Sequence, residues 1–134
     1  MAEFKFINIE KFLNFYEDKS EDKDKSQKKK LNNTGLSYKS RLIKFEKFLK
    51  YTGELANGND KDEVYEFTST FLKRLKTEFH SSGDIDFYEL MIKFYDYLSL
   101  SSLFPKLNDV KSKKDHIYTV VKLLARNKVA IPKG

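Results

Sequence analysis

Apolar side chains recur at intervals of three and four residues along most of this 134-residue chain. Between residues 38 and 49, for example, the stripe consists of Tyr38, Leu42, Phe45 and Leu49. This spacing places the apolar residues on one face of a helix that has about 3.6 residues per turn. Only five Gly and two Pro are present, and a β-sandwich or barrel needs more turn residues than that. The sequence therefore predicts an all-α fold, a compact bundle of four to five helices.

Capping residues and stripe lengths set the expected boundaries of these helices. Ser and Asp side chains accept hydrogen bonds from the free amide groups at a helix start, so Ser37, Asp84 and Asp115 are predicted caps. Gly53 is expected in the left-handed conformation that ends many helices, and Asn127 is expected to end the last helix. The expected helices span residues 37–51, 62–79, 84–98 and 115–127.

The core is expected where these stripes face each other. Most of the 12 Phe and eight Tyr residues fall within the stripes, and aromatic side chains bury a large apolar area each. The predicted core consists of Leu42, Phe45, Leu49, Phe67, Phe71, Leu75, Tyr88, Ile92, Tyr95, Val121 and Leu124.

The N-terminal part differs from the rest of the chain in composition. Residues 1–16 contain a short amphipathic stretch, whereas residues 17–33 hold no aromatic residue and have Leu31 as the single aliphatic residue. Such a polar segment buries too little apolar surface to offset the entropy lost on ordering. We therefore expect a loosely attached amphipathic arm over residues 1–16, a flexible tether over 17–35 and a helical domain over 36–134.

The chain lacks the residue patterns of the common catalytic and metal sites. It has no Cys and two His, and neither His80 nor His116 has a second His three or four residues away. Both histidines are interpreted as surface residues near helix ends. The Gly residues form no phosphate-binding loop, and helix capping explains the neighbouring Asp84 and Asp86. We predict that the protein is not an enzyme and uses no metal or cofactor.

Charge is distributed unevenly along the chain, which has 26 Lys plus Arg against 20 Asp plus Glu and a formal net charge of +6. Residues 36–51 and 106–128 are strongly basic, whereas residues 84–98 hold more acids than bases. The lysines of residues 36–51 are expected on the helix side away from the apolar stripe. Basic residues concentrated in this way are the electrostatic footprint of phosphate binding. The candidate nucleic-acid contacts are Lys39, Arg41, Lys44, Lys47, Lys50, Lys111, Lys113, Lys114, Lys122 and Arg126.

Lysine dominates over arginine, and that ratio bears on how nucleic acid would be bound. Only Arg41, Arg74 and Arg126 supply the guanidinium group, which reads guanine through paired hydrogen bonds. We therefore predict a non-catalytic domain that binds nucleic-acid backbones, alone or in a larger assembly, with little sequence preference. Lys61 and Lys93 lie among acidic residues and are expected to contribute little.

An alternative interpretation assigns the basic charge to solvation alone. The protein is then a helical protein–protein interaction module, such as an adaptor, an inhibitor or a viral regulatory protein. Phe12, Phe15 and Tyr16 of the arm would contact the partner, or a groove would hold an amphipathic partner helix. No segment reaches the roughly 20 apolar residues of a membrane span. We expect a cytoplasmic location, and the run Lys28-Lys29-Lys30 leaves a nuclear one open.

Three amphipathic segments occur in an order found in a known family. They are residues 38–49, residues 84–98, and residues 114–127 followed by an apolar tail with Pro132. Together they resemble the N-terminal SAM-like core-binding domain of tyrosine recombinases and phage integrases. The expected helix over 62–79 departs from the four-helix plan of that family.

This resemblance carries an expectation about the ligand. It implies a helical clamp on duplex DNA in a phage or mobile element, so DNA is favoured over RNA. Lys39, Lys44, Lys47 and residues 111–114 would lie near the DNA backbone. The chain holds no counterpart of the recombinase catalytic domain, so no active site is carried over.

Overall fold

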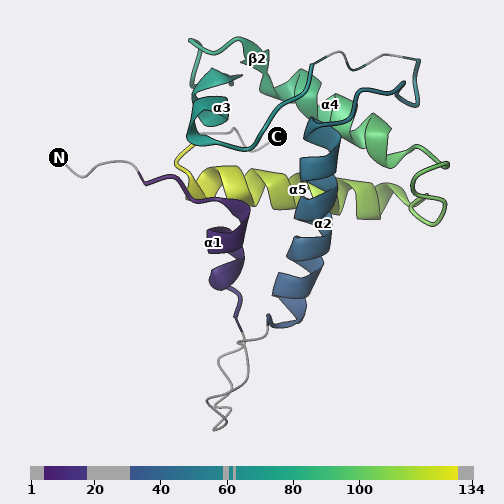
Figure 1. Ribbon diagram of the computed structural model, residues 1–134, viewed down its shortest axis with the longest axis horizontal. Helices are drawn as coiled ribbons and strands as arrows, with labels where there is room; N and C mark the ends of the chain where they lie inside the picture. The colour runs from purple at the N-terminus through teal and green to yellow at the C-terminus, as the bar shows by residue number, and fades with distance from the viewer. Residues whose placement is uncertain (1–4, 18–30, 59–60, 62, 130–134) are drawn as a thin grey trace, which may run out of the picture.

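The computed structural model describes residues 5–17, 31–58, 61 and 63–129. Within these ranges the chain is mostly helical, as predicted, and it adds one small parallel sheet of two strands that the sequence did not predict (Figure 1). No helix in this part of the chain combines the length and apolar character needed to cross a membrane. In chain order the elements are α1 (Ile9–Asn14), α2 (Asn33–Leu49), α3 (Ser69–Arg74), β1 (Leu75–Lys76), β2 (Ile85–Asp86), α4 (Phe87–Leu98) and α5 (Val110–Arg126).

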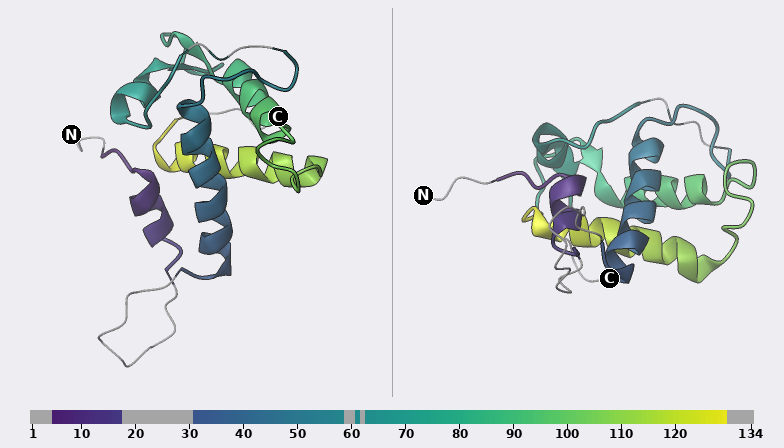
Figure 2. Two further views of the ribbon diagram at one scale, coloured as in Figure 1. Left: turned by 45° about the vertical axis from the view of Figure 1, so that its right-hand side comes forward. Right: turned by 60° about the horizontal axis from the view of Figure 1, so that its bottom comes forward.

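The core lies between α2, α4 and α5. Figures 1 and 2 show α2 crossing α5 at a steep angle, with α4 packed beyond the upper end of α2. At the centre, the ring centroid of Phe94 lies 5.4 Å from that of Phe45 and 5.2 Å from that of Phe48. All three rings are buried, and apolar burial of this kind is the dominant favourable contribution to folding.

The helix α2 begins earlier than predicted. The side chain of Asn32 accepts a hydrogen bond from the amide of Gly35 at 2.8 Å, so Asn32 is the cap and Ser37 lies inside the helix. The prediction for Gly53 is also wrong, because Gly58 and Lys128 are the residues with left-handed φ among those described. The helix instead ends at Leu49, well before Gly53.

The predicted caps of α4 and α5 are wrong in the same way. Asp86, rather than Asp84, accepts a hydrogen bond from the third amide of α4 at 3.0 Å. Asp109, rather than Asp115, accepts one from the second amide of α5 at 3.2 Å. Several neighbouring residues of the same chemical type can cap, and packing selects among them. The predicted end of the last helix at Asn127 is confirmed.

The long helix predicted over residues 62–79 is wrong. The hydroxyl of Thr68 caps a helix of only six residues, α3, and the chain then pairs Leu75 with Ile85 in the parallel sheet. A side chain at Gly83 would lie 2.3 Å from a backbone oxygen of α3, so this close approach needs glycine. The strand pairing depends on this tertiary contact, which apolar spacing does not encode.

Most of the predicted core is buried, but one stripe is shifted. Leu42, Phe45, Leu49, Phe71, Leu75 and Leu124 are buried, and Phe67, Tyr95 and Val121 are partly buried. Tyr88 and Ile92 remain 44% and 61% exposed, so their assignment to the core is wrong. The helix α4 turns the neighbouring stripe inward instead. That buried stripe consists of Phe87, Leu90, Met91, Phe94, Tyr97 and Leu98.

The N-terminal arm is an integral part of the fold, which corrects the expected loose attachment. Phe12 is fully buried, and its ring centroid lies 5.4 Å from that of Tyr16 and 5.9 Å from that of Tyr38. Figure 2 shows α1 alongside α2 and close to the end of α5. Residues 33–35 of the predicted tether belong to α2, and residues 18–30 lie outside the described residues.

Candidate nucleic-acid interface

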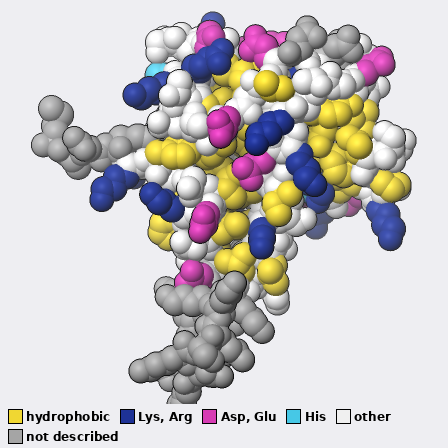
Figure 3. All heavy atoms as spheres, in the orientation of Figure 1, with side chains coloured by type: hydrophobic (Ala, Val, Ile, Leu, Met, Phe, Trp, Pro, Cys, Tyr) yellow, Lys and Arg dark blue, Asp and Glu magenta, His cyan; other side chains and the backbone are white. Residues whose placement is uncertain are grey.

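The basic residues predicted on α2 do not share one face of that helix. Lys39, Lys47 and Lys50 are exposed, whereas Arg41 and Lys44 are partly buried. Lys39 and Lys44 are five residues apart, which separates them by about 140° around the helix axis. Lys39 lines a hollow between α1 and α2, while Arg41 and Lys44 reach α5. In Figure 3 the basic side chains are accordingly spread over the visible face, with acidic side chains among them.

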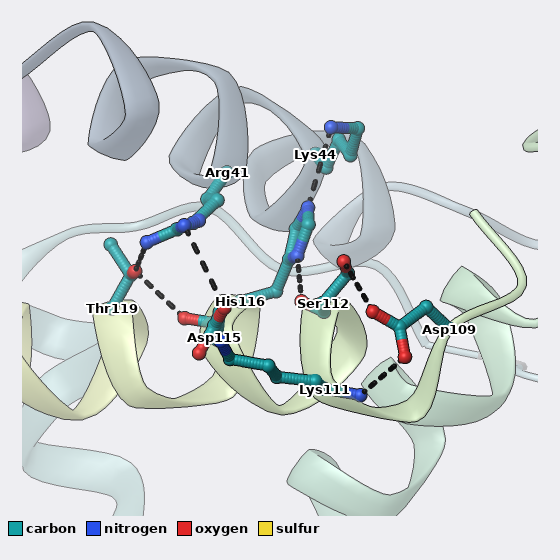
Figure 4. A network of polar contacts seen from close by, with 8 residues as sticks. All are labelled: Arg41, Lys44, Asp109, Lys111, Ser112, Asp115, His116 and Thr119. Carbon is teal, nitrogen blue, oxygen red and sulfur yellow. Dashed lines mark hydrogen bonds and ion pairs between the residues drawn. The ribbon is translucent and has the colours of Figure 1, made fainter. Parts of the chain in front are cut away.

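Arg41 joins α2 to α5. Its guanidinium group donates a hydrogen bond to the hydroxyl of Thr119 at 3.3 Å and lies 3.9 Å from the carboxylate of Asp115 (Figure 4). Thr119 in turn donates to the Asp115 backbone carbonyl at 2.8 Å. Arg41 is therefore held in place by α5, and part of its charge is neutralised there.

Lys44 makes the second polar contact between the two helices, with His116 (Figure 4). Their side-chain nitrogens, Nζ and Nε2, lie 3.3 Å apart. The other ring nitrogen, Nδ1, lies 2.7 Å from the Ser112 carbonyl. A carbonyl only accepts hydrogen bonds, so Nδ1 carries the proton and Nε2 accepts from Lys44.

This arrangement corrects two predictions. His116 is 5% exposed and lies inside α5, so it is not a surface residue at a helix end. Burial lowers the pKa of His116, and the positive charges of Lys44 and Arg41 lower it further. Lys44 does not project freely away from the apolar stripe, and burial followed by the charge of Arg41 lowers its pKa.

The basic residues of α5 divide between two sides of that helix. Lys111, Tyr118, Lys122 and Arg126 follow each other at intervals of four or seven residues, which places them on one stripe. All four are exposed. The spacing in the sequence alone places Tyr118 on this stripe, although the predicted nucleic-acid contacts are all charged residues.

Aromatic rings from α1 and α2 adjoin this stripe. Lys122 Nζ lies 5.7 Å from the ring centroid of Tyr38, and the Arg126 guanidinium carbon lies 4.7 Å from that of Phe15. Tyr16 and Tyr38 meet edge to face with centroids 4.9 Å apart. We call this region the α1–α5 surface. It consists of Phe15, Tyr16, Tyr38, Arg41, Tyr118, Lys122, Arg126 and Lys128.

A hollow of about 470 Å³ opens within the α1–α5 surface. Among the described residues, its lining combines two aromatic rings with three basic side chains and contains no acidic residue. The lining residues are Ile7, Phe15, Tyr16, Lys122, Ala125, Arg126 and Lys128. Phe15 and Tyr16 were predicted to contact a protein partner together with Phe12, but the buried Phe12 is inaccessible. The structure thus brings Phe15 and Tyr16 beside two of the predicted nucleic-acid contacts.

The other predicted basic residues of α5, Lys113 and Lys114, lie toward α4. Lys113 Nζ lies 5.4 Å from the ring centroid of Tyr95. Lys114 lines an apolar hollow of about 250 Å³ together with Met91, Ile92, Tyr95 and Ile117. Figure 3 shows hydrophobic side chains gathered on the right, over α4 and the adjoining part of α5.

Lys61 is the largest departure from the expected electrostatics. It does border a hollow with acidic residues and Lys93, as expected, but its side chain is only 2% exposed. The ammonium group donates a hydrogen bond to the Phe48 carbonyl and lies 3.5 Å from the Phe48 ring centroid. Burial, assisted by the charge of Lys93, lowers the pKa of Lys61 to about 7.

Comparison of the chain with protein-family models, with curated proteins and with solved structures gives no match. Within the described residues, no three His, Asp or Glu side chains converge as ligands for a metal ion. Two features of the described surface bear on function. One is the α1–α5 surface, and the other is the apolar hollow that Lys114 lines, which we call the α4–α5 hollow.

Proposed function

We propose that this protein binds nucleic acid through its phosphate groups, without catalysis, at the α1–α5 surface. The observation that carries this proposal is a hollow in which Lys122, Arg126 and Lys128 lie beside the exposed Phe15 ring and the partly buried Tyr16 ring, with no acidic side chain among the described lining residues. Lys and Arg neutralise phosphates, and each contact releases counterions. Aromatic rings among such cations are typical of nucleic-acid surfaces, because the rings stack on bases.

The exposed lysines of α2 extend the proposal to a larger footprint. Lys39, Lys47 and Lys50 are accessible to solvent and would contact phosphates outside the hollow. The resemblance to recombinase core-binding domains implies duplex DNA as the ligand. Lysine neutralises phosphate as a point charge without reading base edges, so we expect little sequence preference.

A charge reversal on α5 tests this function. With about four to six phosphate contacts, the logarithm of affinity should fall against that of salt concentration with a slope of about −4 to −5. Replacing both exposed residues, Lys122→Glu and Arg126→Glu, should lower the affinity for every oligonucleotide and make this slope shallower. Lys44 is unsuitable for this purpose, because its replacement also removes the contact with His116.

The matched control is the pair Lys73→Glu and Lys106→Glu. Both residues are exposed, lie outside the α1–α5 surface and produce the same change in net charge. Binding should survive in this control, with a much smaller loss than on α5. Equal losses in the two pairs, or no binding at about 50 mM salt, would contradict a defined phosphate-binding surface.

The α4–α5 hollow supports a second candidate function, that of a protein-interaction module. Its walls are mostly apolar, the lining residue Ile92 is 61% exposed, and Lys114 adds a positive charge to the described lining. An acidic amphipathic helix fits this chemistry, with apolar side chains in the hollow and carboxylates near Lys113 and Lys114. Titration with such a peptide should show binding that Ile92→Glu abolishes. Lack of binding to the unaltered protein would contradict this function.

A further inference from the structure

We propose that the hollow in the α1–α5 surface is a stacking site for an unpaired base, so that the protein prefers single-stranded nucleic acid to duplex. This inference rests on the proposed function and makes its ligand specific. It departs from the duplex clamp implied by the recombinase resemblance, and it follows from the position of Phe15 and its neighbours.

Phe15 is placed where a ligand can reach it. Its side chain is 52% exposed, in contrast to the buried Phe12 one turn earlier. The ring lines the hollow beside Tyr16, and Arg126 stands over it with its guanidinium carbon 4.7 Å from the ring centroid. A planar group entering the hollow would meet both an aromatic ring and a guanidinium plane, which are the two surfaces on which proteins stack bases.

The basic residues of the lining suit the phosphate group of a nucleotide. Lys122 and Lys128 add two ammonium groups to the guanidinium of Arg126, and no acidic side chain in the described part of the chain opposes them in the lining. The volume of about 470 Å³ falls within the range of small-molecule sites, about 300–1,000 Å³. A ligand that is flat and aromatic at one end and anionic at the other fits this combination.

The position of the ring inside a hollow should make the protein distinguish single-stranded from duplex nucleic acid. Bases in a duplex are stacked on one another and can enter a hollow only after they are unstacked and unpaired. Bases of a single strand can turn outward and stack on the ring at little cost. Phosphate contacts alone would not make single strands bind more tightly than duplex. A higher affinity for single strands would therefore come from the hollow and not from the basic charge.

The backbone at Lys128 adopts the left-handed conformation that ends many helices. Lys128 follows the C-cap Asn127 and has a φ of 62°, a conformation that favours glycine. Its amide still donates to the Ala125 carbonyl at 3.1 Å, as a helix-ending residue does. This ending places Lys128 directly after α5, where it lines the hollow.

Fluorescence anisotropy with four probes of equal length tests the proposal. The probes are single-stranded oligo-dT, the same sequence as DNA duplex, oligo-U and an abasic deoxyribose-phosphate strand. Single-stranded DNA and RNA should bind about tenfold more tightly than the duplex and the abasic strand. Similar affinities for oligo-dT and oligo-U are expected, since stacking does not read the sugar.

The decisive variant is Phe15→Leu, which keeps an apolar side chain at a half-exposed position and removes the aromatic face. It should weaken binding of the single strands about tenfold and leave the duplex and the abasic strand unchanged. The control Phe79→Leu removes a ring that is also largely exposed, at 67%, and lies outside the hollow, so it should change nothing. Thermal unfolding monitored by circular dichroism verifies that both variants fold.

Three results would overturn the stacking site, and they have different meanings. Equal affinity for single strands and duplex, unaffected by Phe15→Leu, would remove the stacking site but leave phosphate binding intact. No binding to any probe would remove the proposed function as well. Loss of duplex binding in Phe15→Leu, equal to the loss for single strands, would show that the ring acts only by supporting the fold.

Discussion

Asn127 holds the backbone of Ile7, a residue 120 positions earlier in the chain, by a pair of hydrogen bonds. The amide of Ile7 donates to Asn127 Oδ1 at 2.7 Å, and Asn127 Nδ2 donates to the Ile7 carbonyl at 2.9 Å. Asn127 also donates to the Leu123 carbonyl at 3.0 Å and is almost fully buried. This contact attaches the segment before α1 to the end of α5 and thereby places Phe15 beside Arg126.

Replacing this residue, Asn127→Ala, should destabilise the protein substantially. The substitution leaves the amide and carbonyl of Ile7 without partners at a partly buried position, which costs about 1–3 kcal/mol per group. We expect a loss of about 2–4 kcal/mol in the free energy of unfolding, measured by urea denaturation. The exposed Asn108→Ala serves as control and should change stability by less than about 0.5 kcal/mol. A wild-type urea midpoint for Asn127→Ala would show that the contact is dispensable.

His116 should make stability fall as the solution becomes acidic. Its pKa is lowered in the folded state, mainly by burial and then by Lys44 and Arg41, while Asp115 and the Ser112 carbonyl oppose the shift. The unfolded chain therefore takes up a proton near its ordinary pKa of about 6.5 while the folded chain remains neutral. Acidification through this value favours unfolding until the lower folded pKa is reached.

The measurement is the free energy of unfolding between pH 7.5 and 5.5 for the unaltered chain and for His116→Leu. The variant is expected to lose less stability over this interval than the wild type, whatever its stability at pH 7.5. His80→Gln alters the exposed histidine and should retain the wild-type dependence. Parallel curves for His116→Leu and the wild type would show that the buried imidazole does not control acid sensitivity.

Lys61 should make the free energy of unfolding increase as the pH rises through the alkaline range. Its pKa is lowered to about 7 by burial and by the charge of Lys93. Between about pH 7 and the ordinary lysine value near 10.4, the unfolded state binds the additional proton, so raising the pH favours folding. In Lys61→Met the increase in unfolding free energy between pH 7 and 9.5 should be smaller.

Lys61→Met should also be at least as stable as the wild type at pH 7, because it removes the cost of burying an amine. The Phe48 carbonyl keeps a hydrogen bond from the Tyr51 amide at 3.0 Å in this variant. The exposed Lys73→Met is the control and should leave the alkaline dependence unchanged. A steeper rise in Lys61→Met than in the wild type would contradict the lowered pKa.

Lys128→Gly should stabilise the protein and weaken its binding to nucleic acid. Glycine adopts the left-handed conformation of residue 128, φ 62°, at lower cost than lysine, so we expect a stabilisation of about 0.5–1 kcal/mol. The same change removes one ammonium group from the hollow and should weaken nucleic-acid binding severalfold. Calorimetric unfolding and anisotropy measure the two effects. A variant that gains stability and binds as tightly as the wild type would show that Lys128 does not contact the ligand.

The sequence by itself determined that the segments of the three longest helices are helical. The three- and four-residue spacing predicted α2, α4 and α5, because this periodicity is a local property of each helix. It also predicted the end of α5 at Asn127, which is confirmed. Burial of Phe45 and Leu49 follows from the same spacing.

Only the tertiary structure decided which of two possible faces α4 buries and where the short elements form. Packing turned Phe94 of α4 inward and left Ile92 exposed, although both lie on apolar stripes. The pairing of Leu75 with Ile85 replaced a predicted helix, since it requires contact between segments separated by a turn.

The candidate site depended on tertiary structure most of all. Charge composition identified Lys122 and Arg126 as candidates, but nothing in the local sequence connects Arg126 with Phe15, more than 100 positions away. Their contact exists because Asn127 attaches the segment before α1 to the end of α5. Periodicity determines helices one at a time, whereas a binding surface depends on how the helices pack together.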